Sequence, residues 1–137
     1  MTPDQIDLVQ RTWSQVVPLG ADAVRMLYDR IFFLDPSLRR LFGSDMKEQE
    51  RKVMAMMTFA VNGLRRLDQL VPTVEALGRR HSAYGVKDGH YDTVAAALLW
   101  TLEQGLGDAF TPAVREAWTQ AFGILANTMK DAAKLAA

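Results

Sequence analysis

The sequence predicts an all-α fold in which helices cross one another around a single core. Apolar residues recur at intervals of three and four along most of the chain, which is the period of a helix with one buried face. No stretch shows the apolar and polar alternation that is typical of a strand. The predicted helices differ in length and are joined by short connections, which favours crossed helices over an up-and-down four-helix bundle.

The first helix has clear start and stop signals. Thr2 is a typical N-cap, and Pro3 is a residue that helices accept in their first turn. The apolar stripe behind them ends where Pro18 and Gly20 interrupt it. We therefore expect a helix from about residue 3 to about residue 17.

A second helix is predicted over the apolar stripe between residues 24 and 32, which includes Tyr28. Asp35-Pro36 closes this stripe, because the residue before a proline disfavours helical geometry. Residues 37–41 fit only a short helical turn, and Phe42-Gly43 then predicts a sharp bend.

Two helices in the middle of the chain carry polar residues on their apolar sides. A long helix is expected from about Asp45, with Gln49 near its beginning. A shorter helix is expected from about Pro72, and His81 continues its apolar stripe before Gly85 ends it.

Two C-terminal helices complete the predicted fold. Asp88 can cap the first, whose apolar residues run from Tyr91 to Leu106. Thr111-Pro112 repeats the cap and first-turn proline of the N-terminus and is expected to begin the last helix.

Composition narrows the classes of function. Lysine plus arginine and aspartate plus glutamate each number 16, so no overall positive field attracts nucleic acid or an anionic membrane. No apolar run approaches the roughly 20 residues of a membrane span, and the N-terminus lacks a signal-peptide core, so we expect a cytoplasmic protein. The absence of cysteine excludes thiolate metal sites and thiol catalysis, so any metal must be held by nitrogen or oxygen.

Gln49 and His81 are the most informative pair in the chain. They lie 32 residues apart on two predicted helices, and His90 is the only other histidine. An amide and an imidazole facing one gap could hold a metal cofactor between two helices. A histidine on an apolar face can equally be a hydrogen-bonded core residue, and spacing alone leaves both interpretations open.

The flanking motifs decide between them. In order, they are MLYDRIFFLDPSLRRLF, QERKVMAMM, LVPTVEALGRRHSAYGV and HYDTVAAALL. Taken together they make nearly the whole chain resemble a bacterial single-domain globin, and the haem domain of flavohaemoglobins. The resemblance implies a globin fold that holds haem b, with His81 as the iron ligand, Tyr28 and Gln49 on the opposite, distal side, and Phe42 against the porphyrin.

The resemblance also places further side chains around the haem. Apolar and aromatic contacts are expected from Val53, Leu77, Val86, Tyr91 and Val94. Lys52 and Arg80 are candidates for the haem propionates, although as surface charges they need no such role. The carbonyl of Leu77, four residues before His81, is expected to accept the ring N–H that does not face the iron.

The chain departs from the flavohaemoglobin pattern on the proximal side. In that family the proximal histidine is linked to a tyrosine, and to a glutamate that lies near the end of the last helix. These two residues increase the electron density on the imidazole. Tyr91 matches the tyrosine, but residues 129–137 contain no glutamate, and Asp131 is shorter and out of place. At 137 residues we expect a single globin domain over residues 1–137, without flavin- and nicotinamide-binding domains.

Three functions are consistent with these residues. The first is reversible binding or transport of oxygen and other diatomic gases, such as nitric oxide and carbon monoxide, at a five-coordinate ferrous haem. The second is a nitric oxide dioxygenase that takes electrons from a separate reductase. The third is a haem-free helical sensor, which the presence of His81 disfavours.

Overall fold

The computed structural model describes residues 1–42 and 45–136, and every regular element within them is helical. The α-helices are α1 (Pro3–Val16), α2 (Ala21–Leu34), α3 (Met46–Asn62), α4 (Leu67–Ala83), α5 (Asp88–Leu106) and α6 (Pro112–Ala136). A 3-10 segment, η2 (Pro36–Leu41), follows α2 where the sequence predicts a short turn. The all-α prediction is confirmed. Gly43, part of the predicted bend, lies outside the described residues.

Three helices begin where the sequence predicts, each at a side-chain cap. Thr2 and Gln5 exchange backbone-to-side-chain hydrogen bonds at the start of α1. The carboxylate of Asp45 accepts the backbone N–H of Glu48 at 3.0 Å before α3. The hydroxyl of Thr111 accepts the backbone N–H three residues later at 3.2 Å before α6.

The predicted start and length of the fourth helix are wrong. α4 begins at Leu67 instead of Pro72, and α3 and α4 are both 17 residues long. Proline removes one helical hydrogen bond, yet the helix continues on its N-terminal side because Leu70 is buried there, with 2% of its surface exposed. Leu70 packs with Val74, beyond the proline, in the smaller cluster.

The predicted cap of the fifth helix is also displaced. Asp88 is the first residue of α5 instead of its cap, and Lys87 occupies the cap position. The backbone N–H of Lys87 donates to Nδ1 of His90 at 2.9 Å. His90, the third residue of the helix, thus pairs the backbone N–H of the cap residue, which is a different bond from the one expected of an Asp88 cap.

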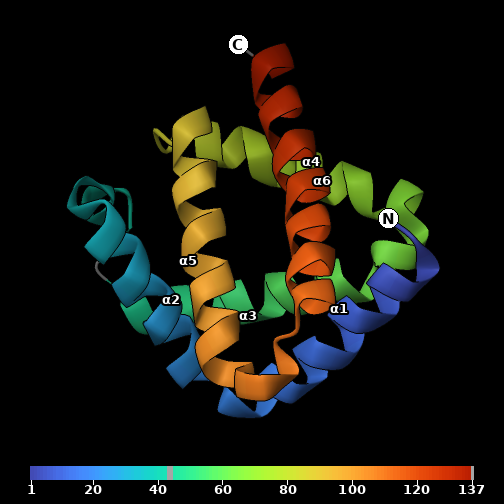
Figure 1. The fold of residues 1–137 in the computed structure, drawn as a ribbon. Helices are drawn as coiled ribbons and strands as arrows, with labels where there is room; N and C mark the ends of the chain where they lie inside the picture. Colours follow the sequence, from blue (N-terminus) through green and yellow to red (C-terminus); the bar gives the residue numbers. More distant parts are fainter. Residues whose placement is uncertain (43–44, 137) are drawn as a thin grey trace.

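The helices form two connected layers (Figure 1). α5 and α6 run side by side, while α3 and α4 cross behind them at different heights. α3 packs mainly on α2 and α1, and α4 packs mainly on α6. The apolar core is correspondingly divided into a large cluster, drawn from α1, α2, α3, α5 and α6, and a smaller cluster around α4.

Two tryptophans fix α1 within the large cluster. The rings of Trp13 and Trp118 lie with centroids 6.0 Å apart. Trp118 donates its indole N–H to the hydroxyl of Thr12 at 2.9 Å, and Trp13 donates to Thr58 at 3.1 Å. These buried donors are therefore paired, and α1 is tied to both α6 and α3.

A close approach between α4 and α6 sets the position of the end of α4. Gly78 is buried, and a Cβ atom added to it would lie 2.4 Å from the carbonyl oxygen of Met129 and 2.5 Å from its Cα. Only glycine allows the two backbones to come this near. His81 lies one turn beyond this contact.

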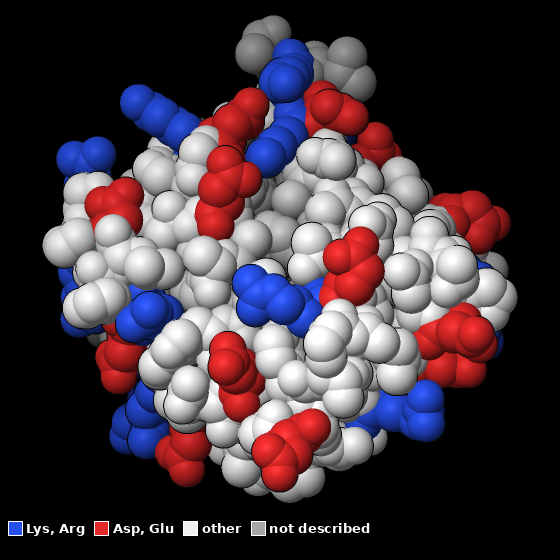
Figure 2. All heavy atoms as spheres, viewed as in Figure 1, with Lys and Arg blue, Asp and Glu red and all other residues white. Residues whose placement is uncertain are grey.

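The surface carries charges of both signs. Figure 2 shows acidic and basic side chains interspersed over the face in view, with no broad area of one sign. Among the described residues, no helix combines the length and the hydrophobicity that crossing a membrane requires.

Candidate functional site

Tyr28 projects from α2 into the large cluster, with 4% of its surface exposed. Its ring lies 5.1 Å from the ring of Phe42, edge to face, and 6.3 Å from that of Phe32. Phe32 and Phe42 also pack edge to face, at 5.2 Å. The rings of Phe32 and Phe42 therefore hold Tyr28 in one orientation.

The hydroxyl of Tyr28 is buried and makes no hydrogen bond with the described residues. Burial, with a smaller contribution from the negative charge of Glu50, raises the pKa of the phenol from 10.0 to about 12. Tyr28 is therefore a neutral donor at physiological pH. A buried hydroxyl without a partner is costly, and it is the kind of group that a polar ligand would satisfy.

Gln49 brings a second unpartnered polar group to the same region of the fold. It lies in the first turn of α3, where its backbone N–H donates to the carbonyl of Asp45 at 3.2 Å. Its side-chain oxygen is buried and has no hydrogen-bond partner among the described residues. α2 and α3 pack on each other, so these two unsatisfied groups come from neighbouring helices. Nε of Arg30, also on α2, is the third buried polar atom without a hydrogen-bond partner among the described residues.

His81 lies in the last turn of α4. Nδ1 of its ring is 2.8 Å from the carbonyl oxygen of Leu77, as the spacing predicts. Because a carbonyl can only accept, Nδ1 carries a proton, and in the neutral ring Nε2 therefore keeps its lone pair. Burial lowers the pKa of His81, and the positive charge of Arg80 adds to this effect. A neutral imidazole with a free Nε2 can bind a metal.

The backbone after His81 is also fixed. Gly85 adopts a left-handed conformation, with φ of +96°, and lets the chain turn back on the helix. The backbone N–H of Val86 then donates to the carbonyl of His81 at 3.0 Å. His90, by contrast, uses Nδ1 to accept the N–H of Lys87, which is a structural role.

The predicted apolar contacts divide between the two clusters. Phe42, Val53 and Val94 pack against the large cluster that contains Tyr28. Leu77 and Val86 pack against the smaller cluster. All five side chains are only half-buried, so an apolar group placed against them would bury more of their surface.

Lys52 and Arg80 are exposed. Neither forms an ion pair with any residue that the structure describes. Both are free to meet an anionic group, and their role with the propionates stays a prediction.

Tyr91 lies beside charged groups of both signs, Lys130 and Asp88. It is 9% exposed, and the ammonium of Lys130 lies 5.4 Å from its ring centroid. A cavity of about 320 Å³ next to it is lined by Ser82, Val86, Lys87, Asp88, Lys130, Ala133 and Lys134. Lys134 of this set pairs with Asp88, at 3.8 Å. No glutamate lines this cavity, in agreement with the departure seen in the sequence.

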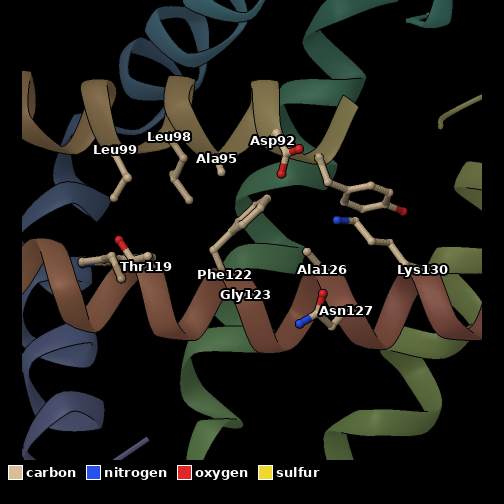
Figure 3. A pocket seen from close by; sticks show the side chains of 12 residues that line it. Asp92, Ala95, Leu98, Leu99, Thr119, Phe122, Gly123, Ala126, Asn127 and Lys130 are labelled. Carbon is tan, nitrogen blue, oxygen red and sulfur yellow. The ribbon is translucent and has the colours of Figure 1, made fainter. Parts of the chain in front are cut away.

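A second cavity, of about 210 Å³, lies between α5 and α6. Figure 3 shows Phe122 extending from α6 toward α5, with Ala95 and Leu98 facing it. Of the predicted site residues, only Tyr91 lines this cavity.

Sequence analysis missed Glu50. This residue follows Gln49 directly, and only 8% of its surface is exposed. One of its carboxylate oxygens lies 3.5 Å from Nε of Arg25 on α2. The signal in the sequence is a glutamate in register with Met46, Met54 and Met57 on one face of the helix, but only the packing of α2 on α3 shows that it is buried.

The comparisons with known proteins agree with this geometry. The globin family model matches residues 25–129, which is more than half of the chain. The chain belongs to the globin family. This globin is 30% identical over 133 residues to a flavohemoprotein of Xylella fastidiosa, covering 95% of the chain and 33% of the relative. It is 29% identical over 125 residues to a flavohemoprotein of Bacillus subtilis, covering 89% of the chain and 31% of that protein.

This globin thus spans about a third of the length of these curated relatives. A solved bacterial globin from Campylobacter jejuni superimposes with a TM-score of 0.86 at 24% identity, covering 97% of the chain and 96% of the solved one. That likeness confirms the predicted globin fold.

Proposed function

We propose that this globin holds haem b through His81 and reversibly binds oxygen and other diatomic gases. The observation that carries the proposal is the arrangement of three groups. A neutral imidazole with a free Nε2 lies on α4, and two unpartnered buried polar side chains, Tyr28 and Gln49, lie on α2 and α3. Membership of the globin family and similarity to flavohemoproteins support a haem-binding role.

The residues present fit a haem. Their chemistry matches the needs of a large apolar ring with a metal centre and an anionic edge. Half-buried apolar side chains from both clusters suit the ring, Nε2 of His81 suits the iron, and exposed Lys52 and Arg80 suit the propionates. When bound, the haem supplies an iron at which a diatomic gas can bind.

The side chains around the haem would determine the rate at which a bound gas dissociates. Tyr28 would donate a hydrogen bond to a polarised ligand such as oxygen, and the raised pKa keeps its proton in place. Gln49 would orient its amide toward the same ligand. Val53, one turn beyond Gln49, would help to exclude water. Leu77 would hold the His81 ring in one tautomer and orientation.

The test is reconstitution of the purified protein with haem. We expect one haem per chain, a five-coordinate ferrous spectrum, and spectral changes on addition of carbon monoxide and oxygen. A six-coordinate ferrous spectrum would contradict the assignment, because glutamine is a poor iron ligand and α3 carries no histidine. Failure to bind haem would overturn the proposal.

Nitric oxide dioxygenase activity is the second candidate, favoured by the similarity to flavohemoproteins at 29–30% identity. The assay of this chain supplies a separate reductase. Steady conversion of nitric oxide to nitrate under a reductant and oxygen would support this activity. A single turnover followed by arrest would leave gas binding as the function.

A further inference from the structure

Glu50 is the one charged residue among the buried residues that the structure describes. An isolated buried carboxylate is costly, and an apolar residue of similar size would often be as stable or more so. Met46, Met54 and Met57 on the same face of α3 show that apolar side chains are accommodated there. Its charge therefore calls for an explanation other than stability.

The partner of Glu50 compensates its charge only in part. Arg25 has 57% of its side chain exposed, whereas Glu50 has 11%. Arg25 also contacts Asp22, at 3.3 Å, so one guanidinium serves two carboxylates. Water screens the positive charge much more than the negative one. The interior side of this pair consequently has a net negative potential.

That potential reaches the distal side of the proposed haem site. Glu50 is adjacent to Gln49 on α3, and Arg25 is one turn from Tyr28 on α2. The negative charge of Glu50 also contributes, after burial, to the raised pKa of Tyr28.

We propose that Glu50 sets the charge selectivity of the distal side, disfavouring anionic ligands and so reserving the site for neutral diatomic gases. This inference rests on the proposed haem-binding function. A ligand with a full negative charge is repelled by the buried carboxylate, whereas an uncharged ligand is affected little. Oxygen gains only a partial negative charge on binding, so its repulsion by Glu50 lies between these limits. The hydrogen bond from the Tyr28 hydroxyl would offset that repulsion.

The experiment compares the affinity of the ferric haem protein for azide and fluoride, which are anions, with that for imidazole, at about pH 8 where imidazole is neutral. Glu50→Gln removes the charge and keeps the size. Glu48→Gln is the matched control, because Glu48 lies in the same helix turn, has 42% of its side chain exposed and pairs with Arg51. Both variants change the net charge equally.

We expect Glu50→Gln to bind azide and fluoride about 3- to 30-fold more tightly, as a lightly screened unit charge at close range predicts. Affinity for imidazole should change by less than about twofold, as should every affinity of Glu48→Gln, since an exposed charge is well screened. Glu50→Asp, which keeps the charge, should behave as the unsubstituted protein does.

A second measurement does not depend on ligand affinity. The infrared stretching frequency of carbon monoxide on the ferrous protein falls when negative potential near the ligand is removed. It should therefore fall in Glu50→Gln and stay constant in Glu48→Gln.

Equal behaviour of Glu50→Gln and Glu48→Gln, or equal shifts for azide and imidazole, would overturn the selectivity role while leaving haem binding intact. Failure of the unsubstituted protein to form a haem complex would instead overturn both proposals, before any variant is compared.

Discussion

Tyr28→Phe is the substitution that isolates the distal hydroxyl most cleanly. It deletes one oxygen atom and keeps the ring that packs on Phe32 and Phe42. Because that hydroxyl makes no hydrogen bond with the described residues, its removal breaks no hydrogen bond of the fold that they form. An effect on gas binding can then be assigned to the hydroxyl itself.

The structure predicts opposite effects on stability and on gas release. Burying a hydroxyl without a partner costs roughly 1–3 kcal/mol, so the ligand-free phenylalanine variant should be at least as stable as the parent. A hydrogen bond to partly charged oxygen is worth roughly 1.5–3 kcal/mol. At about 1.4 kcal/mol per tenfold, oxygen should dissociate about 10 to 100 times faster from the variant.

Stopped-flow displacement measures this for the parent, Tyr28→Phe, Gln49→Leu and the double variant. Carbon monoxide accepts hydrogen bonds weakly, so its dissociation should change much less than that of oxygen. Gln49→Leu should act in the same direction with a smaller effect, and the double variant should be non-additive because both donors serve one ligand. Equal shifts for the two gases would mean an enlarged pocket, and no shift for oxygen would remove Tyr28 from the mechanism.

Three further predictions follow from the same geometry. His81→Gly should lose haem or retain it only with added imidazole, while His90→Ala should keep an unchanged haem spectrum; the reverse pattern would show that the iron ligand is misassigned. Gly78→Ala should lower the free energy of unfolding by about 1–3 kcal/mol in urea titrations, because its methyl group would meet the backbone of Met129 at 2.4 Å; unchanged stability would refute that contact. Folding raises the pKa of Tyr28 from 10.0 to about 12, so the unfolded chain loses the phenol proton at a lower pH than the folded protein does. The free energy of unfolding should therefore be unaffected by this group below pH 10 and should fall by roughly 3 kcal/mol as the pH rises toward 12. Tyr28→Phe should lose less stability over that pH interval, and identical pH curves for the two proteins would contradict the raised pKa.

Local features of the fold were predictable from the sequence. The helix starts at Thr2, Asp45 and Thr111 depend on side chains that bond a backbone N–H three residues away. The hydrogen bond from His81 to Leu77 spans one helical turn. The stripes predicted only an all-α fold; the globin fold was predicted from the resemblance of the motifs to known globins, and the comparisons confirm it. The haem contacts, including the iron ligand, stay predictions until haem binding is measured.

Other features depend on residues far apart in the sequence, and only the tertiary structure decided them. α4 begins five residues before the predicted start because the fold buries Leu70. Glu50 is buried because α2 brings Arg25 against α3. Gly78 is required because α6 passes within contact distance of α4. The sequence determined where most helices form and which side chains they carry, since caps and helical hydrogen bonds join residues only one or two turns apart. Which of those side chains lose water and meet a partner was determined by packing between helices, because burial is a property of the assembled fold.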